Sequence, residues 1–271
     1  MPTPTPCYHF NSAIVRKPSI SVIRGLRAEE RGDPDYEAVQ AEHQAYVAAL
    51  ESAGLNVIVL PGLEAFPDSL FVEDPALVFS EGAVLLNAGA ASRQGEAQEL
   101  SPVLHDCFDT VLELRENGHV DGGDILVTPK SVLIGLSART DPAGAAVLID
   151  CLKTLGYKSE VVHTPTGVLH FKTECSLLDE ETVLLTQRMA QSDLFNGFRK
   201  MVIPDGEEPA ANALRINDSV LVSAGYQRTI DMLAGSGYAI VPVKTEEIEK
   251  IDAGLSCMSL RWFHNRKPNK F

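Results

Sequence analysis

The stretch DPDYEAVQAEHQAYVAALESAGLNVIVL, residues 33–60, contains one complete step from a helix to a strand. Asp33 can accept hydrogen bonds from the free N–H groups at a helix start, and Pro34 suits the first helical position. Aromatic and apolar side chains then share one helical face: Tyr36, Val39, His43, Tyr46, Val47 and Leu50. Gly54 ends this helix, and the apolar run that follows it predicts a buried strand.

The same kinds of element recur along the chain in short pieces. Helices are predicted over 33–53, 94–108, 141–155, 192–199 and 226–235, and Asp141-Pro142 opens one of them as Asp33-Pro34 opens the first. Short apolar strands are predicted at 12–16, 56–60, 70–72, 75–80, 83–87, 110–114, 124–128, 131–135, 159–163, 182–186, 200–203, 213–216, 219–222 and 238–243. A doubly wound sheet needs one long helix for each strand, which this order does not supply. Recurring strand–strand–helix–strand units favour a closed, radially repeated α/β body instead.

Composition and charge bear on the kind of partner and on the number of domains. Hydrophobic residues make up 45% of the chain and charged residues 22%, as in ordinary globular proteins. The net charge of −14 argues against a nucleic-acid partner, because phosphate binding needs a basic face. It could raise the local concentration of a cationic small molecule. No linker rich in Gly, Ser or Pro divides the chain, so we expect one domain over residues 1–271.

The cysteines indicate a reducing compartment. There are five of them, without a CxxC pair or zinc-ligand spacing: Cys7, Cys107, Cys151, Cys175 and Cys257. The first ten residues lack the basic and apolar regions of a secretory signal, and no apolar run is long enough for a membrane span. We therefore expect a cytoplasmic protein with free thiols and no membrane partner.

Four polar segments carry most of the side chains that could do chemistry. They are PDSLFVEDP at 67–75, NGHVDGGD at 117–124, GVLHFKTECS at 167–176 and GLSCMSLRW at 254–262. Taken singly, each has a structural explanation: a buried cysteine, a hydrogen-bonded histidine, a tight glycine turn, or capping carboxylates. Together they are typical of a cysteine nucleophile with a distant base. Cys257 would supply the thiolate, His170 the base, and Asp121 the group that orients this base.

These segments also carry a specific resemblance. PDSLFVEDP, VDGGD, GLSART, GVLHFKTECS and KIDAGLSCMSLRW resemble, in order and in spacing, the motifs of the dimethylarginine dimethylaminohydrolase family within the guanidine-modifying superfamily. The match runs from about Ser12 to Trp262. It implies a five-bladed α/β propeller of ββαβ units with pseudo-fivefold symmetry, in agreement with the five predicted helices. It also implies a hydrolase that uses neither a cofactor nor a metal.

The resemblance implies a role for each residue at the reacting end of the site. Cys257 matches the nucleophile, His170 the general acid and base, and Asp121 the acidic triad position, which some members fill with glutamate. Asp74, beside Glu73, matches the carboxylate that grips the guanidinium. A guanidinium is planar and always cationic, so paired carboxylates can hold its carbon over a sulfur atom.

Other residues match the part of the family's site that binds the amino-acid end of the substrate. Arg93 and Arg139 match the arginines that bind the carboxylate, and Asp68 matches a positioning residue. Leu26 falls on the mobile lid between the first strand and the first helix. Ile251 matches a backbone contact to the substrate amine.

Two features bear on this amino-acid end. Arg93 could instead form a surface salt bridge with Glu96, three residues further along a helix. The dipeptide Asn87-Ala88 stands where several relatives carry Arg-Pro, and Gln94 stands where they carry a second arginine.

The expected function is hydrolysis of asymmetric dimethylarginine or monomethylarginine to citrulline and the methylated amine. The expected partner is this small-molecule substrate, and a homodimer is left open. One alternative is an arginine deiminase-like enzyme, although that family is typically longer and usually carries arginine where this chain has Glu73. Another is a propeller that binds an amino acid without chemistry, against which the intact motifs argue. Cys175 is the rival nucleophile, and its apolar surroundings favour burial.

Overall fold

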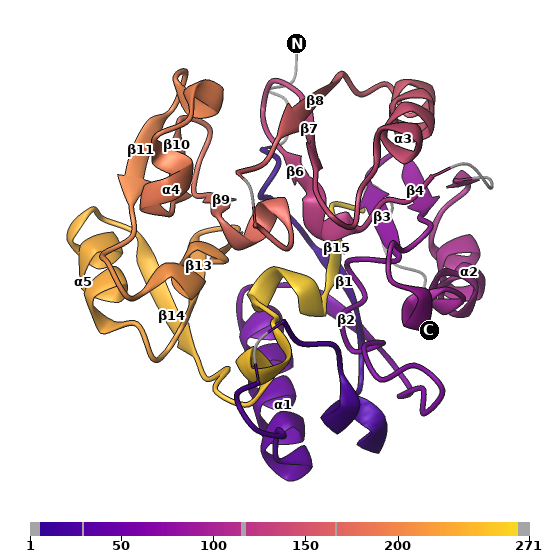
Figure 1. The fold of residues 1–271 in the computed structure, drawn as a ribbon, viewed down its shortest axis with the longest axis horizontal. Helices are drawn as coiled ribbons and strands as arrows, with labels where there is room; N and C mark the ends of the chain where they lie inside the picture. Colours follow the sequence, from indigo (N-terminus) through magenta and orange to yellow (C-terminus); the bar gives the residue numbers. More distant parts are fainter. Residues whose placement is uncertain (1–5, 29, 115–117, 166, 265–271) are drawn as a thin grey trace.

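The computed structural model describes residues 6–28, 30–114, 118–165 and 167–264, and its strands form five three-stranded sheets. The sheets stand around a central axis, with the helices at the outside (Figure 1). In every sheet the middle strand is antiparallel to the inner strand and parallel to the outer one. A helix connects the middle strand to the outer strand. The predicted five-bladed α/β architecture of ββαβ units is confirmed.

Each blade consists of an inner strand, a middle strand, a helix and an outer strand. In that order, blade 1 has β15 (Leu260–Trp262), β1 (Ser12–Arg16), α1 (Tyr36–Ser52) and β2 (Asn56–Leu60); blade 2 has β3 (Ala76–Phe79), β4 (Gly82–Leu85), α2 (Glu96–Cys107) and β5 (Val111–Glu113); blade 3 has β6 (Ile125–Val127), β7 (Val132–Leu136), α3 (Pro142–Thr154) and β8 (Ser159–His163); blade 4 has β9 (Cys175–Leu177), β10 (Thr182–Leu185), α4 (Gln187–Ala190) and β11 (Arg199–Val202); blade 5 has β12 (Leu214–Ile216), β13 (Ser219–Ser223), α5 (Gln227–Gly235) and β14 (Ala239–Val243). Because the last strand of the chain pairs with the first, residues near 260 close the ring.

The core consists of five apolar clusters, one between each pair of neighbouring blades. Strand β1 shows how this arises: Ala13 and Val15 pack toward blade 5, whereas Ile14 packs toward blade 2. Successive side chains of a strand point to opposite faces, so a strand between two neighbours is buried on both. This explains why the strands read as short, continuous apolar runs. Within the described residues, no helix is long and apolar enough to cross a membrane.

The first helix begins later than the sequence predicts. Asp35, and not Asp33, is its N-cap, and the Asp35 side chain accepts a hydrogen bond of 2.8 Å from the N–H of Ala38. Asp33 instead forms an ion pair with Arg27. The second predicted cap is confirmed, because the Asp141 side chain accepts from the N–H group of Gly144.

The prediction is wrong in blade 4. In place of a helix over 192–199, the structure has the one-turn helix α4 and a separate 3₁₀ turn at Asp193–Phe195. Thr186 caps α4 through the N–H of Met189, and buried Phe195 anchors the 3₁₀ turn. Residues 70–72 form turns and not a strand. The strands β9 and β15 are absent from the predicted set, because three residues are too few to show an alternating pattern.

Candidate active site

The predicted site residues share one place in the fold. Asp74 stands just before the inner strand of blade 2, Asp121 before that of blade 3, His170 before that of blade 4, and Cys257 before that of blade 1. The inner strands surround one axis, so the segments that lead into them meet at one end of it. Blade 5 contributes Asn212 at the equivalent position, a residue that the sequence did not single out.

Asp121 holds the imidazole of His170. Its Oδ2 lies 3.0 Å from His170 Nε2, and its Oδ1 accepts a hydrogen bond of 2.8 Å from the N–H of Gly89. Burial lowers the pKa of His170, but the carboxylates of Asp74, Asp121 and Asp124 outweigh it and raise the pKa to about 9. His170 is therefore an imidazolium at neutral pH, with Nε2 donating to Asp121.

Asp74 lies between this imidazolium and a second cation. Its Oδ1 accepts a hydrogen bond of 2.9 Å from the N–H of Gly123, and its Oδ2 pairs with the guanidinium of Arg93. Burial raises the pKa of Asp74, but His170 and Arg93 outweigh this and hold the pKa below its ordinary value. Asp74 is thus a buried carboxylate that stays ionised.

The glycine pair at 122–123 is required by close packing in the site. A Cβ atom on Gly122 would lie 2.0 Å from the carbonyl oxygen of Glu73. A Cβ atom on Gly123 would lie 2.8 Å from the ring of His170 and 2.9 Å from Asp74 Oδ1. The VDGGD segment therefore lets two carboxylates and an imidazole approach one another, which a simple surface turn would not require.

Asp124, at the end of that segment, ties the loops of blade 3 to His170. Its Oδ1 accepts a hydrogen bond of 2.8 Å from the N–H of Phe171. Its Oδ2 accepts from the hydroxyl groups of Ser137 and Thr140, both at 2.6 Å. This fixes the backbone directly after His170 and so the direction of the imidazole.

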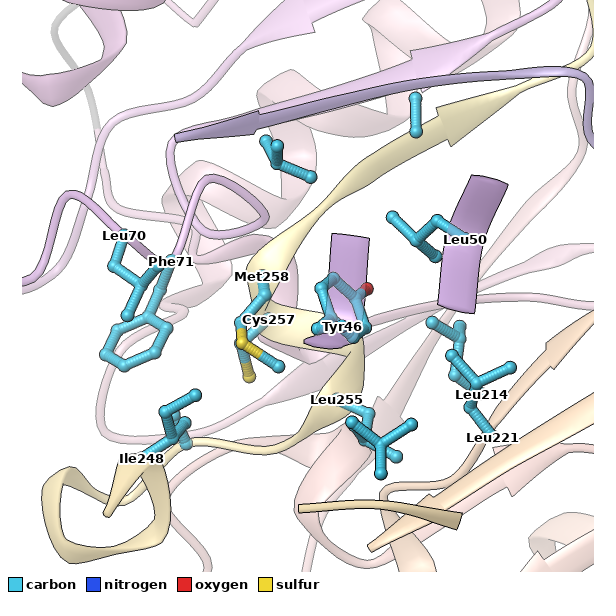
Figure 2. Packing of buried hydrophobic residues seen from close by; sticks show 14 of the residues in the cluster. Tyr46, Leu50, Leu70, Phe71, Leu214, Leu221, Ile248, Leu255, Cys257 and Met258 are labelled. Atoms are coloured by element: carbon cyan, nitrogen blue, oxygen red, sulfur yellow. The ribbon is translucent and has the colours of Figure 1, made fainter. Parts of the chain in front are cut away.

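Cys257 lies in a 3₁₀ turn, Leu255–Met258, and is only 8% exposed. Figure 2 shows it in the apolar cluster between blades 1 and 5, with Phe71 on one side and Tyr46 on the other. Burial raises the pKa of its thiol to about 12, and the charges of Glu73 and Asp74 add to this effect. Asp74 therefore acts on both Cys257 and His170. At rest the sulfur is a neutral thiol.

Both carboxylate oxygens of Glu73 are already occupied by side chains of the protein, which differs from a carboxylate that is free to bind substrate. Its Oε1 lies 2.5 Å from Lys172 Nζ and 3.1 Å from Arg261 Nη2, and its Oε2 accepts a hydrogen bond of 2.8 Å from Ser256. These four side chains also line an axial cavity of about 580 Å³, whose lining does not include Cys257. Glu73 and its cations thus form the floor of the site. Lys172 lies two residues after His170 in the segment GVLHFKTECS, but the sequence does not show that it reaches Glu73.

Arg93 is buried and anchors Asp74. Besides that ion pair, its Nε and Nη2 donate to Glu96 at 3.1 and 2.6 Å, and Nη2 also donates to the carbonyl of Phe71 at 2.8 Å. The pairing with Glu96 raised from the sequence is present, but it lies in the interior and not on the surface. The guanidinium of Arg93 is already paired with the carboxylates of Asp74 and Glu96. Its position therefore suits holding Asp74 in place better than binding the carboxylate of a substrate.

Four other predicted residues meet beside this group. Asp68 Oδ1 accepts a hydrogen bond of 2.8 Å from the N–H of Leu26, and a Cβ atom on Gly25 would lie 3.2 Å from both Asp68 and Ile251. Leu26 itself is 38% exposed. Burial raises the pKa of Asp68, and Arg93 and Arg139 oppose the shift. Within the described part of the chain, the Arg139 guanidinium has no hydrogen bond or ion pair.

Two other groups of side chains could in principle do chemistry near this site. Asp74, Asp121 and His170 offer ligand atoms within 4.8 Å of one another, a spacing that a metal ion could bridge. However, His170 already pairs with Asp121, and Asp74 with Arg93, so the donors form a complete acid–base set. Cys175 is fully buried, its Sγ donates to the carbonyl of Phe171, and burial raises its pKa. It is a core residue.

Comparison with known proteins gives one consistent result. Residues 26–186 match the family model described as N,N dimethylarginine dimethylhydrolase, eukaryotic. The N(G),N(G)-dimethylarginine dimethylaminohydrolase of Pseudomonas aeruginosa is 37% identical over 93% of this chain and 100% of its own length. The enzyme of the same name from Streptomyces coelicolor is 31% identical, covering 92% and 96%. A solved structure of a cysteine-to-serine mutant of the Pseudomonas protein complexed with citrulline superposes with a TM-score of 0.91, at 36% identity, covering 94% of this chain and 100% of that one.

Proposed function

Since this chain belongs to the dimethylarginine dimethylaminohydrolase family of guanidine-modifying hydrolases, we propose that it hydrolyses a methylated arginine to citrulline and the methylated amine, with Cys257 as nucleophile. The observation that carries the proposal is the placement of buried Asp74, whose charge acts on both His170 and Cys257. A substrate guanidinium near this carboxylate would offset the charge that keeps Cys257 protonated. Binding of the cationic substrate would thus lower the pKa of the Cys257 thiol and favour the thiolate.

The reaction then proceeds through two half-reactions. When the cation binds, the thiol proton leaves to solvent, and the thiolate forms an S–C bond to the guanidinium carbon. His170 gives its proton to the departing methylamine as the C–N bond breaks. Water then attacks the resulting thiouronium and gives a proton to His170. As the C–S bond breaks, the hydroxyl proton of the tetrahedral adduct passes to the departing sulfur, which releases citrulline and restores the thiol of Cys257.

The amino-acid end of the substrate is proposed to lie between Asp68, Ile251 and Arg139. Asp68 and the backbone at Ile251 suit an ammonium group, and the guanidinium of Arg139 suits a carboxylate. Leu26, held to Asp68 through its N–H, would cover the bound substrate. Arg93 contributes indirectly by holding Asp74.

A panel of substrates tests this proposal. We expect asymmetric dimethylarginine and monomethylarginine to give citrulline and the matching methylamine, both quantified, at rates well above that of arginine. Ammonia from arginine as the dominant product would replace the proposal with a deiminase. Binding of all three compounds without any product would leave only an amino-acid-binding propeller.

The pH dependence of kcat/KM gives a second test, because this parameter reports the ionisation of the free enzyme. At low pH Cys257 is a thiol and His170 an imidazolium, while the reactive form has one proton fewer. With pKa values of about 9 for His170 and about 12 for Cys257, the reactive form increases about tenfold per pH unit below pH 9. We expect kcat/KM to rise from pH 6 to 8 and to level off near 9. A value that is flat or falling between pH 6 and 8 would show that the thiolate already exists at rest.

A further inference from the structure

Asn212 occupies the one blade position that the proposed reaction leaves without a role. It stands just before β12, where the other four blades carry Asp74, Asp121, His170 and Cys257. The residue is only 7% exposed. A buried amide with two donors and two acceptor lone pairs remains in a protein interior only where its hydrogen bonds are made.

The hydrogen bonds of Asn212 join two segments that are far apart in the sequence. Its Oδ1 accepts a bond of 2.9 Å from the N–H of Ser256, the neighbour of Cys257. Its Nδ2 donates to the hydroxyl of Ser256 at 3.2 Å and to the carbonyl oxygen of Lys172 at 3.1 Å. Lys172 is two residues beyond His170. One amide therefore bridges the turn that carries the sulfur and the segment that carries the imidazole.

The Asn212 amide is also closely packed against the start of the turn that carries Cys257. A Cβ atom on Gly254 would lie 2.3 Å from Asn212 Cγ, so the backbone at the start of the Cys257 turn packs directly against the amide. Ser256, held by Asn212 on one side, donates its hydroxyl to Glu73 on the other. Removal of the Asn212 amide would therefore free the turn from the His170 segment, while Ser256 and the carbonyl of Cys257 stay bonded to Glu73.

We infer that Asn212 is a positioning residue, which fixes the sulfur of Cys257 relative to the imidazole of His170 without contacting either reacting group. The inference rests on the proposed function for the identity of these two groups. A displacement of about 1 Å between reacting atoms can lower the rate about 100-fold. We therefore expect the loss of the Asn212 hydrogen bonds to lower kcat. The groups proposed to bind substrate, at Asp68, Asp74, Arg139 and Ile251, make no hydrogen bond to Asn212 in the described chain, so we expect KM to stay nearly unchanged.

Asn217 supplies a matched control in the same blade. Its side chain also makes three hydrogen bonds, to the N–H and the carbonyl of Phe10 and to the carbonyl of Ala53, far from the site. We expect Asn212→Ala to lower kcat about 10- to 100-fold with KM within about twofold. Asn217→Ala should lower the melting temperature at least as much as Asn212→Ala does, because the φ of 51° at position 217 disfavours alanine. Its kcat and KM should both stay within about twofold of the wild type.

Alkylation of Cys257 by iodoacetamide, followed by peptide mass spectrometry, provides a readout that needs no substrate. Because burial is the main cause of the raised thiol pKa, a loosened turn should expose the sulfur, and alkylation at pH 8 should be about fivefold or more faster in Asn212→Ala. Asn217→Ala should alkylate like the wild type. An unchanged kcat in Asn212→Ala, or equal effects of the two variants, would overturn the inference. If the wild type processed no methylated arginine, the proposed function would fail, and the alkylation comparison alone would decide the role of Asn212.

Discussion

Replacing Cys257 by serine should lower kcat by about 10⁴-fold or more, while the fold and substrate binding remain. The substitution changes one side-chain atom of a residue that is only 8% exposed, so it leaves the packing between blades 1 and 5 nearly unchanged. A serine hydroxyl, however, ionises far less readily than a thiol. The charge of one bound guanidinium, which suffices for a thiol, is too small to generate the alkoxide. Turnover of dimethylarginine, titration calorimetry with the same compound and thermal unfolding measure the three quantities.

Cys175→Ser is the matched control for this experiment. Cys175 is a fully buried cysteine that donates to a backbone carbonyl, a bond that a serine hydroxyl can also make. We expect this variant to lose some stability and to keep its kcat. Activity that survives Cys257→Ser, or that disappears equally in both variants, would show that the nucleophile is assigned to the wrong residue.

The sequence predicts the architecture well because each blade repeats a local pattern. Short apolar runs and one helix per unit indicate recurring strand–strand–helix–strand units, and the family resemblance adds the five-bladed propeller. Asp141 caps its helix as expected, whereas the first helix is capped by Asp35 and not by Asp33. The errors occur where tertiary contacts replace local signals. In blade 4 a helix of one turn is sufficient because Phe195 is buried separately. Strands β9 and β15 are too short to show an alternating pattern, although Ser176 and Arg261 each lie between two buried apolar residues.

The candidate site shows the same limit at the level of single side chains. The motif residues do gather at one end of the axis, and His170 pairs with Asp121 as the sequence predicts. The sequence alone could not reveal that Glu73 is bound by Lys172 and Arg261, which lie about 100 and nearly 190 residues away along the chain. Nor could it place Arg93 in the interior, because a pair at i and i+3 reads the same on a surface helix and in a core.

Replacing His170 by glutamine should separate the two half-reactions. The glutamine amide can still donate to Asp121, so the buried carboxylate keeps a partner, but it can neither give nor accept a proton. Loss of general acid and base catalysis should lower kcat for dimethylarginine by about 10³-fold. His43→Gln is the matched control: His43 is also a buried histidine, it lies in α1, and its replacement should leave kcat unchanged.

A substrate whose leaving group needs no proton shows which step depends on His170. S-methylthiocitrulline expels methanethiolate, which departs without prior protonation, so attack by Cys257 can proceed in His170→Gln while hydrolysis of the adduct stalls. Mass spectrometry should therefore find the covalent adduct on the peptide that contains Cys257. The pH dependence should also change, because removing the group with a pKa of about 9 leaves only the thiol, with a pKa of about 12, to titrate. The rate of adduct formation should keep rising above pH 9, where the wild type levels off. An adduct that hydrolyses as fast as in the wild type would mean that another group activates the water.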